Sequence, residues 1–370
     1  MLKQSSRLSI FVVMFTLVIT VSVASQVWKP AGPAPRAGHS AVLDTATNSM
    51  VVFGGQITSA NAAPSVDTNE LWRFNNNGSW TPLTATGTLP AGRLWHTSVY
   101  DQANNRMIMF GGAEGFSAPC ANDVWVLTDA NGLTGTPAWS QLTTVGGPPA
   151  PRAQHGAAYD PNTNSLIVYG GQDCFATLMG DVWALSNANG LGGTPTWTQL
   201  FPTGGGPGPR TIIGSVAYDS ANNRLIVFGG AFGGVFNDVW ILSNANGQGG
   251  TPNWTLLSPT GTPPSARANN SATYDPASNR LTIFGGCNGT SCSNLLGDTW
   301  VLANANGLGG TAMWRQLGPF SLFSEVRHTH TAVYNPSTNR MTIFGGFTAN
   351  ASTTGTTTND VWMLSRANGH

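Results

Sequence analysis

One phrase of the sequence recurs almost verbatim at a regular interval. "LSNANGLGGTPTWTQL" begins at Leu185, and close copies begin at Leu127, Leu242 and Leu302. A fifth copy begins at Leu364 and reads only "LSRANGH". The starts of the four long copies are 58, 57 and 60 residues apart. A period of this size indicates a chain of repeated units, arranged either as a propeller or as a solenoid.

Three further landmarks keep the same spacing. An aromatic residue followed by two glycines begins at Phe53, Phe110, Tyr169, Phe228, Phe284 and Phe344. An acid two residues before a Trp occurs at Glu70, Asp123, Asp181, Asp238, Asp298 and Asp360. A Pro-rich stretch ends in Arg36, Arg93, Arg152, Arg210, Arg267 and Arg327. The sequence therefore predicts six structurally equivalent units.

Each unit has the pattern of four short strands, here named a, b, c and d. In the third unit they cover residues 155–160, 165–171, 181–185 and 196–200. A four-residue turn joins a to b, which is typical of a hairpin, and no segment has helical length or period. We expect an all-β, six-bladed propeller with four antiparallel strands per blade. The blades are predicted at about 36–83, 93–142, 152–200, 210–257, 267–317 and 327–364.

The sixth unit ends before a d strand, and a d-like segment stands alone at residues 26–30. The d-strand tryptophans are Trp28, Trp80, Trp139, Trp197, Trp254 and Trp314, one for each blade. We therefore predict that residues 26–30 complete the last blade and close the ring without a covalent bond. Closure removes the exposed sheet edges that would pair with other chains.

The residues of this pattern resemble those of kelch-repeat proteins. The resemblance rests on the Gly-Gly doublet after strand b, the "NDVW" of strand c, the strand-d Trp, and "PRAGHSAV" before strand a. It covers nearly everything after residue 24 and implies a propeller like the central domain of galactose oxidase. The family includes both enzymes and binding modules, so the resemblance is informative about fold and much less about function. As a whole the chain looks like an exported bacterial kelch protein.

The N-terminus has the features of a secretory signal peptide. Lys3 and Arg7 precede the apolar run 8–23, and small residues at 22–24 offer a cleavage site after Ala24. We predict a signal peptide over 1–24, with an uncleaved membrane anchor as the alternative, and one propeller over 25–370. The mature chain is expected to be secreted or periplasmic, monomeric and without a membrane span. Only 9% of residues are charged and the net charge is zero, which argues against nucleic-acid binding.

No metal or cofactor site is predicted. Copper-radical chemistry of the galactose oxidase kind needs spare tyrosines, and all six here occupy repeat positions. Asp129 lies in one copy of the recurrent phrase, but three of the four long copies have no carboxylate, so a turn is favoured over a Ca²⁺ site. Histidines recur at one position before strand a, where we interpret them as structural rather than as ligands: His39, His96, His155 and His330.

All four cysteines fall in the predicted b–c loops. In an exported chain this arrangement predicts disulfides, and three pairings are possible. Cys287 and Cys292 share one loop, whereas Cys120 and Cys174 lie in loops of neighbouring blades. These positions favour Cys287 with Cys292 and Cys120 with Cys174.

The b–c loops differ most between units, so they are the part of the scaffold expected to carry function. We predict a binding module whose partner is an extracellular protein or a glycan, held on the face formed by b–c loops and d–a connections. The candidate ligand-binding residues are Arg93, Arg152, Arg210, Phe116, Phe175 and Phe236. For the arginines, pairing with the strand-c acids is the competing structural interpretation. The alternative functions are a carbohydrate-active enzyme using Glu114 and Asp173, or a structural surface protein.

Overall fold

The computed structural model describes residues 31–58, 65–115, 119–289, 292–318, 326–348 and 356–370. Residues 31–370 belong to one compact unit. Within the described ranges the regular structure is β-sheet, with no α-helix, and no helix is long and apolar enough to cross a membrane. The all-β expectation is confirmed.

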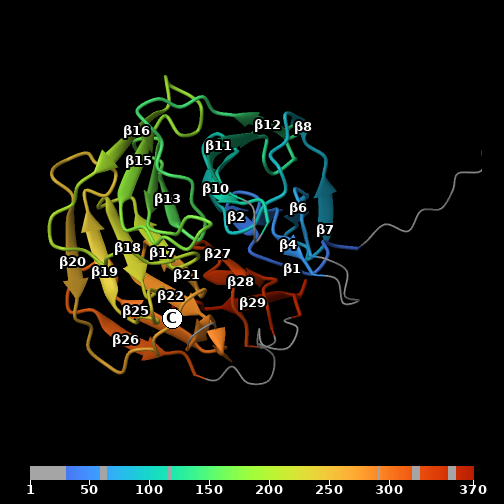
Figure 1. Cartoon of the computed structure of the whole chain (residues 1–370). Coiled ribbons are helices and arrows are strands. Elements are labelled where there is room, and N and C mark those ends of the chain that lie inside the picture. Colours follow the sequence, from blue (N-terminus) through green and yellow to red (C-terminus); the bar gives the residue numbers. More distant parts are fainter. Residues whose placement is uncertain (1–30, 59–64, 116–118, 290–291, 319–325, 349–355) are drawn as a thin grey trace, which may run out of the picture. The chain divides into compact units, whose positions relative to one another are not determined.

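Six main sheets follow one another along the described chain (Figure 1). Blade one contains β2 (Ser40–Asp44), β3 (Ser49–Phe53), β6 (Leu71–Phe74) and β7 (Trp80–Leu83). Blade two contains β9 (Thr97–Asp101), β10 (Arg106–Ala113), β11 (Cys120–Thr128) and β12 (Ala138–Gln141), with the short β8 (Thr86–Gly87) parallel to β12. Blade three contains β13 (Gly156–Asp160), β14 (Ser165–Tyr169), β15 (Val182–Ser186) and β16 (Thr196–Leu200).

The remaining blades repeat this design. Blade four contains β17 (Val216–Asp219), β18 (Arg224–Phe228), β19 (Val239–Ser243) and β20 (Asn253–Leu257). Blade five contains β21 (Ser271–Asp275), β22 (Arg280–Phe284), β25 (Thr299–Ala303) and β26 (Met313–Gln316). Blade six has three described strands, β27 (Thr331–Asn335), β28 (Arg340–Phe344) and β29 (Val361–Ser365). Two small sheets lie in the loops: β1 (Arg36–Ala37), β4 (Gln56–Ile57) and β5 (Val66–Asp67), and β23 (Cys287–Asn288) with β24 (Asn294–Leu295).

The innermost strand of each blade lies against the innermost strands of its two neighbours. They meet in the order β2, β9, β13, β17, β21, β27 and again β2. A belt of backbone hydrogen bonds runs along the same path. Gly38 N–H donates to Thr329 O at 3.2 Å, joining blade one to blade six, and Trp95 N–H donates to Gly38 O at 2.8 Å. The first and last described blades are thus in direct contact at the centre.

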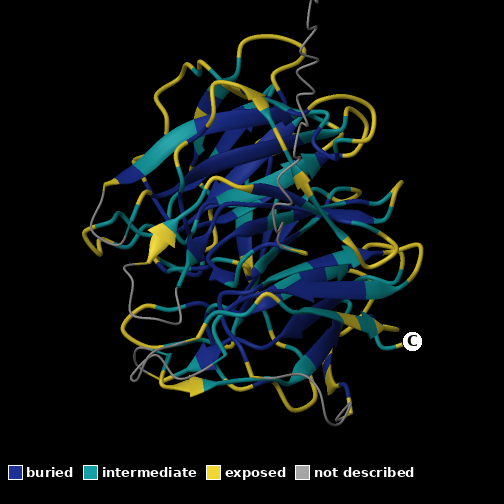
Figure 2. Cartoon of the chain, turned by 90° about the vertical axis from the view of Figure 1, so that its right-hand side faces the viewer, coloured by how far each residue is buried: buried dark blue, intermediate teal, exposed yellow. Residues whose placement is uncertain are grey.

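Burial follows each strand's position in its blade. The second strands, such as β3 and β14, are buried along their full length because a neighbouring blade covers each face. The first strands alternate buried and partly exposed residues, as in β13, and the outer strands carry exposed residues. In Figure 2 the strands of the interior are accordingly dark blue and the yellow segments are mostly loops.

Aromatic residues join consecutive blades. In the described chain, the aromatic residue of five aromatic-Gly-Gly landmarks contacts the outer-strand Trp of the next blade, as Phe110 does with Trp197 at 5.2 Å between ring centroids. The other pairs are Phe53–Trp139, Tyr169–Trp254, Phe228–Trp314 and, across the junction of blades six and one, Phe344–Trp80. The glycines are needed for close approach. At Gly55, where φ is +89°, an added Cβ would lie 2.7 Å from the Cβ of His39.

The segment predicted to close the ring, residues 26–30 with Trp28, lies outside the described residues. By analogy with the other blades, we expect Trp28 next to Phe284 of blade five. Gly32, just after that segment, approaches the outer strand of blade one, since an added Cβ would lie 2.8 Å from Trp80 Cδ1. Closure by residues 26–30 stays a prediction, and the path of the chain at Gly32 is compatible with it.

The recurrent phrase forms the loop between the third and fourth strands, and its second Asn reaches the neighbouring blade. Asn189 Nδ2 donates to Asp101 Oδ2 at 2.7 Å, so that blade three holds the end of β9 in blade two. We call this contact the Asn–Asp clasp. It recurs as Asn131–Asp44, Asn246–Asp160, Asn306–Asp219 and Asn368–Asp275. The shortened fifth copy of the phrase therefore still carries a clasp residue.

Candidate functional site: the b–c loop face

The six repeat arginines lie inside the blades. Arg152 is fully buried, and its Nη1 and Nη2 donate to the two carboxylate oxygens of Asp181 at 2.7 and 2.9 Å. Nη1 also donates to Gly170 O at 3.1 Å. Equivalent ion pairs join Arg36–Glu70, Arg93–Asp123, Arg210–Asp238, Arg267–Asp298 and Arg327–Asp360. Bidentate pairs of this kind fix both side chains.

These pairs change the ionisation of the acids. Burial by itself raises the pKa of Asp181, but the hydrogen bond and charge of Arg152 outweigh burial and leave the pKa below its ordinary value. In blade six, burial likewise raises the pKa of Asp360, but the hydrogen bonds it accepts, that of Arg327 first, outweigh burial and lower the pKa to about 2. Asp181 and Asp360 are therefore carboxylates at neutral pH, and each neutralises its arginine.

The predicted ligand-binding role of Arg93, Arg152 and Arg210 does not match this geometry. Their side chains are at most 4% exposed and their guanidinium groups are already paired within their own blades. A ligand would have to break a buried ion pair to reach them, which is a large penalty. The competing structural interpretation fits the contacts instead.

The predicted phenylalanines behave differently from one another. Phe175 is 82% exposed on the b–c loop of blade three. Phe236 is half-buried, and the Arg210 guanidinium lies 4.3 Å from the centre of its ring. Phe116 lies outside the described residues. Phe232, which the sequence also places on the b–c loop of blade four, is 58% exposed.

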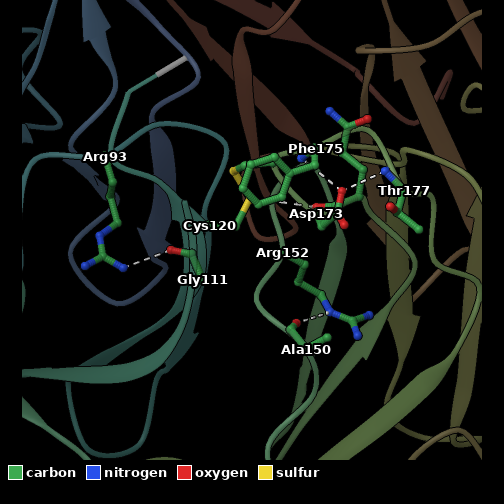
Figure 3. Close-up of a disulfide and its surroundings, with 10 residues drawn as sticks. Arg93, Gly111, Cys120, Ala150, Arg152, Asp173, Phe175 and Thr177 are labelled. Atoms are coloured by element: carbon green, nitrogen blue, oxygen red, sulfur yellow. Dashed lines mark hydrogen bonds between the residues drawn. A yellow bond between two sulfur atoms is a disulfide. The ribbon is translucent and has the colours of Figure 1, made fainter. Parts of the chain in front are cut away.

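Glu114 and Asp173, the two candidate catalytic acids, both hold structure. Glu114 accepts a 3.5 Å contact from Arg93. Asp173 caps its own turn, accepting hydrogen bonds from the backbone N–H groups of Phe175 at 3.0 Å and Thr177 at 2.6 Å (Figure 3). Those backbone donors, Thr177 first, lower the pKa of Asp173, which disfavours the protonated form that a general acid needs.

Both predicted disulfides are present. Cys120–Cys174 joins the b–c loops of blades two and three, with the two Cα atoms 5.3 Å apart. Cys287–Cys292 closes a short loop in blade five. The first bond anchors the turn that carries Asp173 and the exposed Phe175 (Figure 3). It therefore restricts the position of these side chains on the loop face.

A groove of about 390 Å³ opens on this face over blades three and four. Its polar lining comes from Gln154, Gln172 and Thr211, and its apolar lining includes Leu178 and Phe232. Backbone bridges Gln172–Leu178 and Thr211–Ala231 hold the loops that form it. Among the described residues that line this groove, none carries a charged side chain. The site thus combines uncharged hydrogen-bonding groups with exposed apolar surface.

The repeat histidines lie between blades rather than in a ligand cage. His96 Nε2 hydrogen-bonds the Ser40 hydroxyl of blade one at 2.8 Å, and its ring packs edge-on against Phe53. His39, His155 and His330 make equivalent contacts with hydroxyls of adjacent blades. Burial lowers the pKa of His96 to about 3, so the ring is neutral. These contacts match the structural interpretation. Three of the rings also line a central cavity of about 170 Å³.

The tyrosine hydroxyls are likewise engaged. Tyr100 donates to Asn105 Oδ1 at 2.7 Å in its own turn, and four other tyrosines repeat this bond: Tyr159, Tyr218, Tyr274 and Tyr334. Tyr169 donates to Gly208 O at 2.6 Å. Burial raises the pKa of Tyr334 to about 12. None of the six therefore offers a free phenolate, and the residues do not fit a copper-radical site.

Comparisons with known proteins agree with the fold. The KLHDC2/KLHL20/DRC7 Kelch-repeats domain matches residues 5–210 and 133–248. The chain is 33% identical over 162 residues to the bovine Rab9 effector protein with kelch motifs, covering 42% of this chain and 40% of that protein. It is 34% identical over 206 residues to the Drosophila melanogaster leucine-zipper-like transcriptional regulator 1 homolog, covering 54% and 19%. The chain thus spans well under half the length of these relatives.

Two solved structures share the architecture at low sequence identity. The structure of YjhT aligns with a TM-score of 0.57 and 15% identity, covering 90% of this chain and 99% of that one. A fungal alcohol oxidase of the AA5 family, in complex with copper, aligns with a TM-score of 0.56 and 16% identity, covering 93% and 66%. At these identities the likeness concerns the fold alone. The family match spans more than half of the sequence, and with the blade structure it establishes that the chain belongs to the kelch-repeat family.

Proposed function

We propose that this protein is an exported kelch-repeat binding module that holds a protein or glycan ligand on its b–c loop face. The observation that carries the proposal is the groove over blades three and four, which is lined by the exposed Phe232; the loop that supplies Leu178 to it also carries the exposed Phe175. Three phenylalanines are more than half exposed in the described chain, namely Phe175, Phe201 and Phe232, and all three lie in b–c loops or d–a connections. Exposed aromatics beside hydrogen-bonding groups are common in recognition surfaces.

The opposite face is a poor candidate because its loops are nearly identical. Four copies of the recurrent phrase present the same residues, and their conserved Asn side chains are occupied by the clasps. A ligand there would meet almost the same surface four times. The b–c loops differ in length and content, so they are able to form one asymmetric site.

Export is supported by the apolar N-terminal run and by the two disulfides, which persist in oxidising compartments. Two relatives are named as a Rab9 effector and as a transcriptional regulator homolog. These names describe the relatives, and they support protein binding as the general role of a kelch domain. N-terminal sequencing of the exported chain tests cleavage after Ala24. A mature N-terminus far from residue 25, or retention in the cytoplasm, would contradict this part of the proposal.

The binding role is tested by screening the mature chain on a glycan array and in a pull-down from extracellular extract, then comparing two matched double variants. Phe175→Ala with Phe232→Ala removes exposed rings at the groove. Leu191→Ala with Leu308→Ala removes exposed side chains from the c–d loops. We expect the first pair to weaken binding at least tenfold, about 1.4 kcal/mol, and the second to leave it unchanged. The reverse result would place the site on the other face.

The enzyme alternative is separated by the same screen. Glycan cleavage that is abolished by Glu114→Gln or Asp173→Asn would favour the carbohydrate-active enzyme. Binding without turnover, unaffected by these two substitutions, supports the binding module. Absence of any ligand in both screens would favour a structural surface protein.

A further inference from the structure

A second cluster of reactive side chains lies in blades five and six, beside the proposed ligand groove. The sulfurs of Cys287 and Cys292 and a ring nitrogen of His328 lie within 4.8 Å of one another. Cys287 and His328 are buried, whereas Cys292 is partly exposed. Two sulfurs and one imidazole are a ligand set that Zn²⁺ takes in proteins, with a fourth position left for water or another ligand.

The histidine is oriented as a ligand would be. Its Nδ1 hydrogen-bonds the Thr329 hydroxyl at 2.8 Å, and its ring stacks on Phe347 with the centroids 5.2 Å apart. Its Nε2 is buried and has no hydrogen-bond partner among the described residues. A buried, unpaired ring nitrogen is unfavourable unless something occupies it. A hydrogen bond at the other ring nitrogen is the usual way in which proteins fix a metal-binding imidazole.

The surroundings also suit sulfur ligands. Asn269 Nδ2 lies 3.3 Å from Cys292 Sγ and 3.8 Å from Cys287 Sγ and donates toward them. A side-chain amide in this position stabilises negative charge on sulfur.

We propose that Cys287, Cys292 and His328 form a redox-controlled Zn²⁺ site. In the oxidised protein the two cysteines are joined as a disulfide and cannot ligate. A dithiol reductant transfers two electrons and two protons to the S–S bond and is itself oxidised to a disulfide. The two thiols then lose their protons as Zn²⁺ binds both sulfurs and His328 Nε2. The site is thereby empty under oxidising conditions and filled under reducing ones.

The proposal has a structural consequence for the loop face. Gly289, between the two cysteines, is part of the lining of the ligand groove. Reduction of the disulfide and binding of Zn²⁺ would therefore change the loop next to the proposed ligand site. The metal site itself depends only on the three side chains, so it is tested without any ligand of the groove.

The experiment uses the full mature chain, reduced with dithiothreitol, freed of reductant without oxygen and titrated with Co²⁺ as a spectroscopic substitute for Zn²⁺. We expect one equivalent of Co²⁺ to give sulfur-to-cobalt charge-transfer bands that Zn²⁺ displaces. The oxidised chain should give none. Charge-transfer bands report sulfur ligation directly, and a merely structural role of these residues would not produce them.

Matched variants define the ligands. Cys287→Ser should abolish the bands, and His328→Ala should weaken Zn²⁺ binding by more than about 10–100-fold, the loss that follows removal of a residue that only supports a ligand. His370→Ala, at an exposed terminal histidine, and Cys120→Ser with Cys174→Ser should leave them unchanged. Thermal melting of each reduced variant identifies any that has unfolded, and His328→Gln then replaces His328→Ala. No bands in the reduced chain, equal bands in the oxidised chain, or unchanged affinity after loss of His328 would each overturn the proposal.

Discussion

The Asn–Asp clasp gives a prediction whose size follows from the contacts of one residue. Asn246, buried in the c–d loop of blade four, donates from Nδ2 to Asp160 Oδ2 at 2.7 Å. Its Oδ1 accepts from Asn223 Nδ2 at 2.6 Å and from Gln248 N–H at 2.8 Å. Asn246→Ala removes these three hydrogen bonds together with a longer one from Nδ2 to Thr163 Oγ1 at 3.4 Å.

The cost is dominated by the partner in blade three. Asp160 is 2% exposed and loses its inter-blade donor, although Asn162 N–H and Thr163 Oγ1 still donate to it. A buried group left without one of its partners costs about 1–3 kcal/mol. With the two loop bonds, the expected loss in the free energy of unfolding is about 2–3 kcal/mol, equal to a fall in Tm of roughly 3–4 °C for a chain of this size.

Two companion variants make the assay specific. Gln248→Ala changes an exposed side chain in the same loop and should stay within about 0.5 kcal/mol of the wild type. Asn246→Asp places a second carboxylate against Asp160 and should be less stable than Asn246→Ala at pH 7. Like charges raise the folded-state pKa above the unfolded value, so the repulsive penalty is absent at low pH and appears as pH rises.

Differential scanning calorimetry at pH 7 and at pH 4 measures all three variants. If Asn246→Ala has the same melting temperature as Gln248→Ala, the clasp contributes nothing to inter-blade stability and the prediction is wrong. It is refuted also if Asn246→Asp is as stable as the wild type at neutral pH. Equal behaviour of Asn189→Ala in blade three would extend the result to an independent copy.

Three further predictions concern closure, the disulfides and the buried ion pairs. Trp28→Ala should cost about 3–5 kcal/mol if Trp28 packs as the other outer-strand tryptophans do, and a chain beginning at Pro33 that melts like the mature protein would contradict closure. Peptide mapping without reduction should find Cys120 linked to Cys174 and Cys287 linked to Cys292, and free thiols in the native protein would contradict this pairing. The double variant Cys120→Ser with Cys174→Ser should lower the free energy of unfolding by about 2–4 kcal/mol. Arg327→Ala should cost about 3–5 kcal/mol by leaving Asp360 unpaired. Because the folded-state pKa of Asp360 is lowered to about 2, the stability that this pair contributes is present above pH 4 and is lost as the pH falls toward 2. The urea midpoints of the wild type and the variant should therefore converge at low pH. A constant difference between the midpoints would show that the charge of Asp360 does not contribute.

Much of the fold could be predicted because each landmark recurs in register. The Gly-Gly doublets, strand-c acids and strand-d tryptophans mark strand positions six times, and the observed sheets follow them. The disulfide pairing could be predicted because loop position restricts which cysteines meet. Less could be predicted about side-chain partners. Spacing places Arg152 and Asp181 in one unit, but it does not show that their groups meet inside the blade rather than at its surface.

The candidate site was the least predictable part, for a physical reason. The b–c loops lack a repeated pattern, so no internal comparison reveals which of their side chains are exposed. Phe236 was expected to face a ligand and instead stacks over Arg210, whereas Phe232, four residues earlier, is exposed at the groove. Likewise His328 stands two residues before a repeat histidine, and its proximity to Cys287 and Cys292 depends on loop geometry that spacing does not contain.

The near-identity of the recurrent phrase now has a mechanical explanation that local turn chemistry did not supply. Each copy must serve its own turn and also reach the blade before it, so the clasp Asn is constrained from two sides. Asn105 and its equivalents add a third contact by donating to the clasp Asn of the same blade. At the b–c loops the recurring inter-blade contact is a backbone hydrogen bond, from the second glycine of each doublet to the repeat arginine of the next blade, as from Gly112 N–H to Arg152 O. The side chains of these loops are therefore free to differ. The c–d loops are held nearly identical by the clasps, whereas the side chains of the b–c loops vary from blade to blade. This difference allows a nearly symmetric ring to present a single asymmetric site.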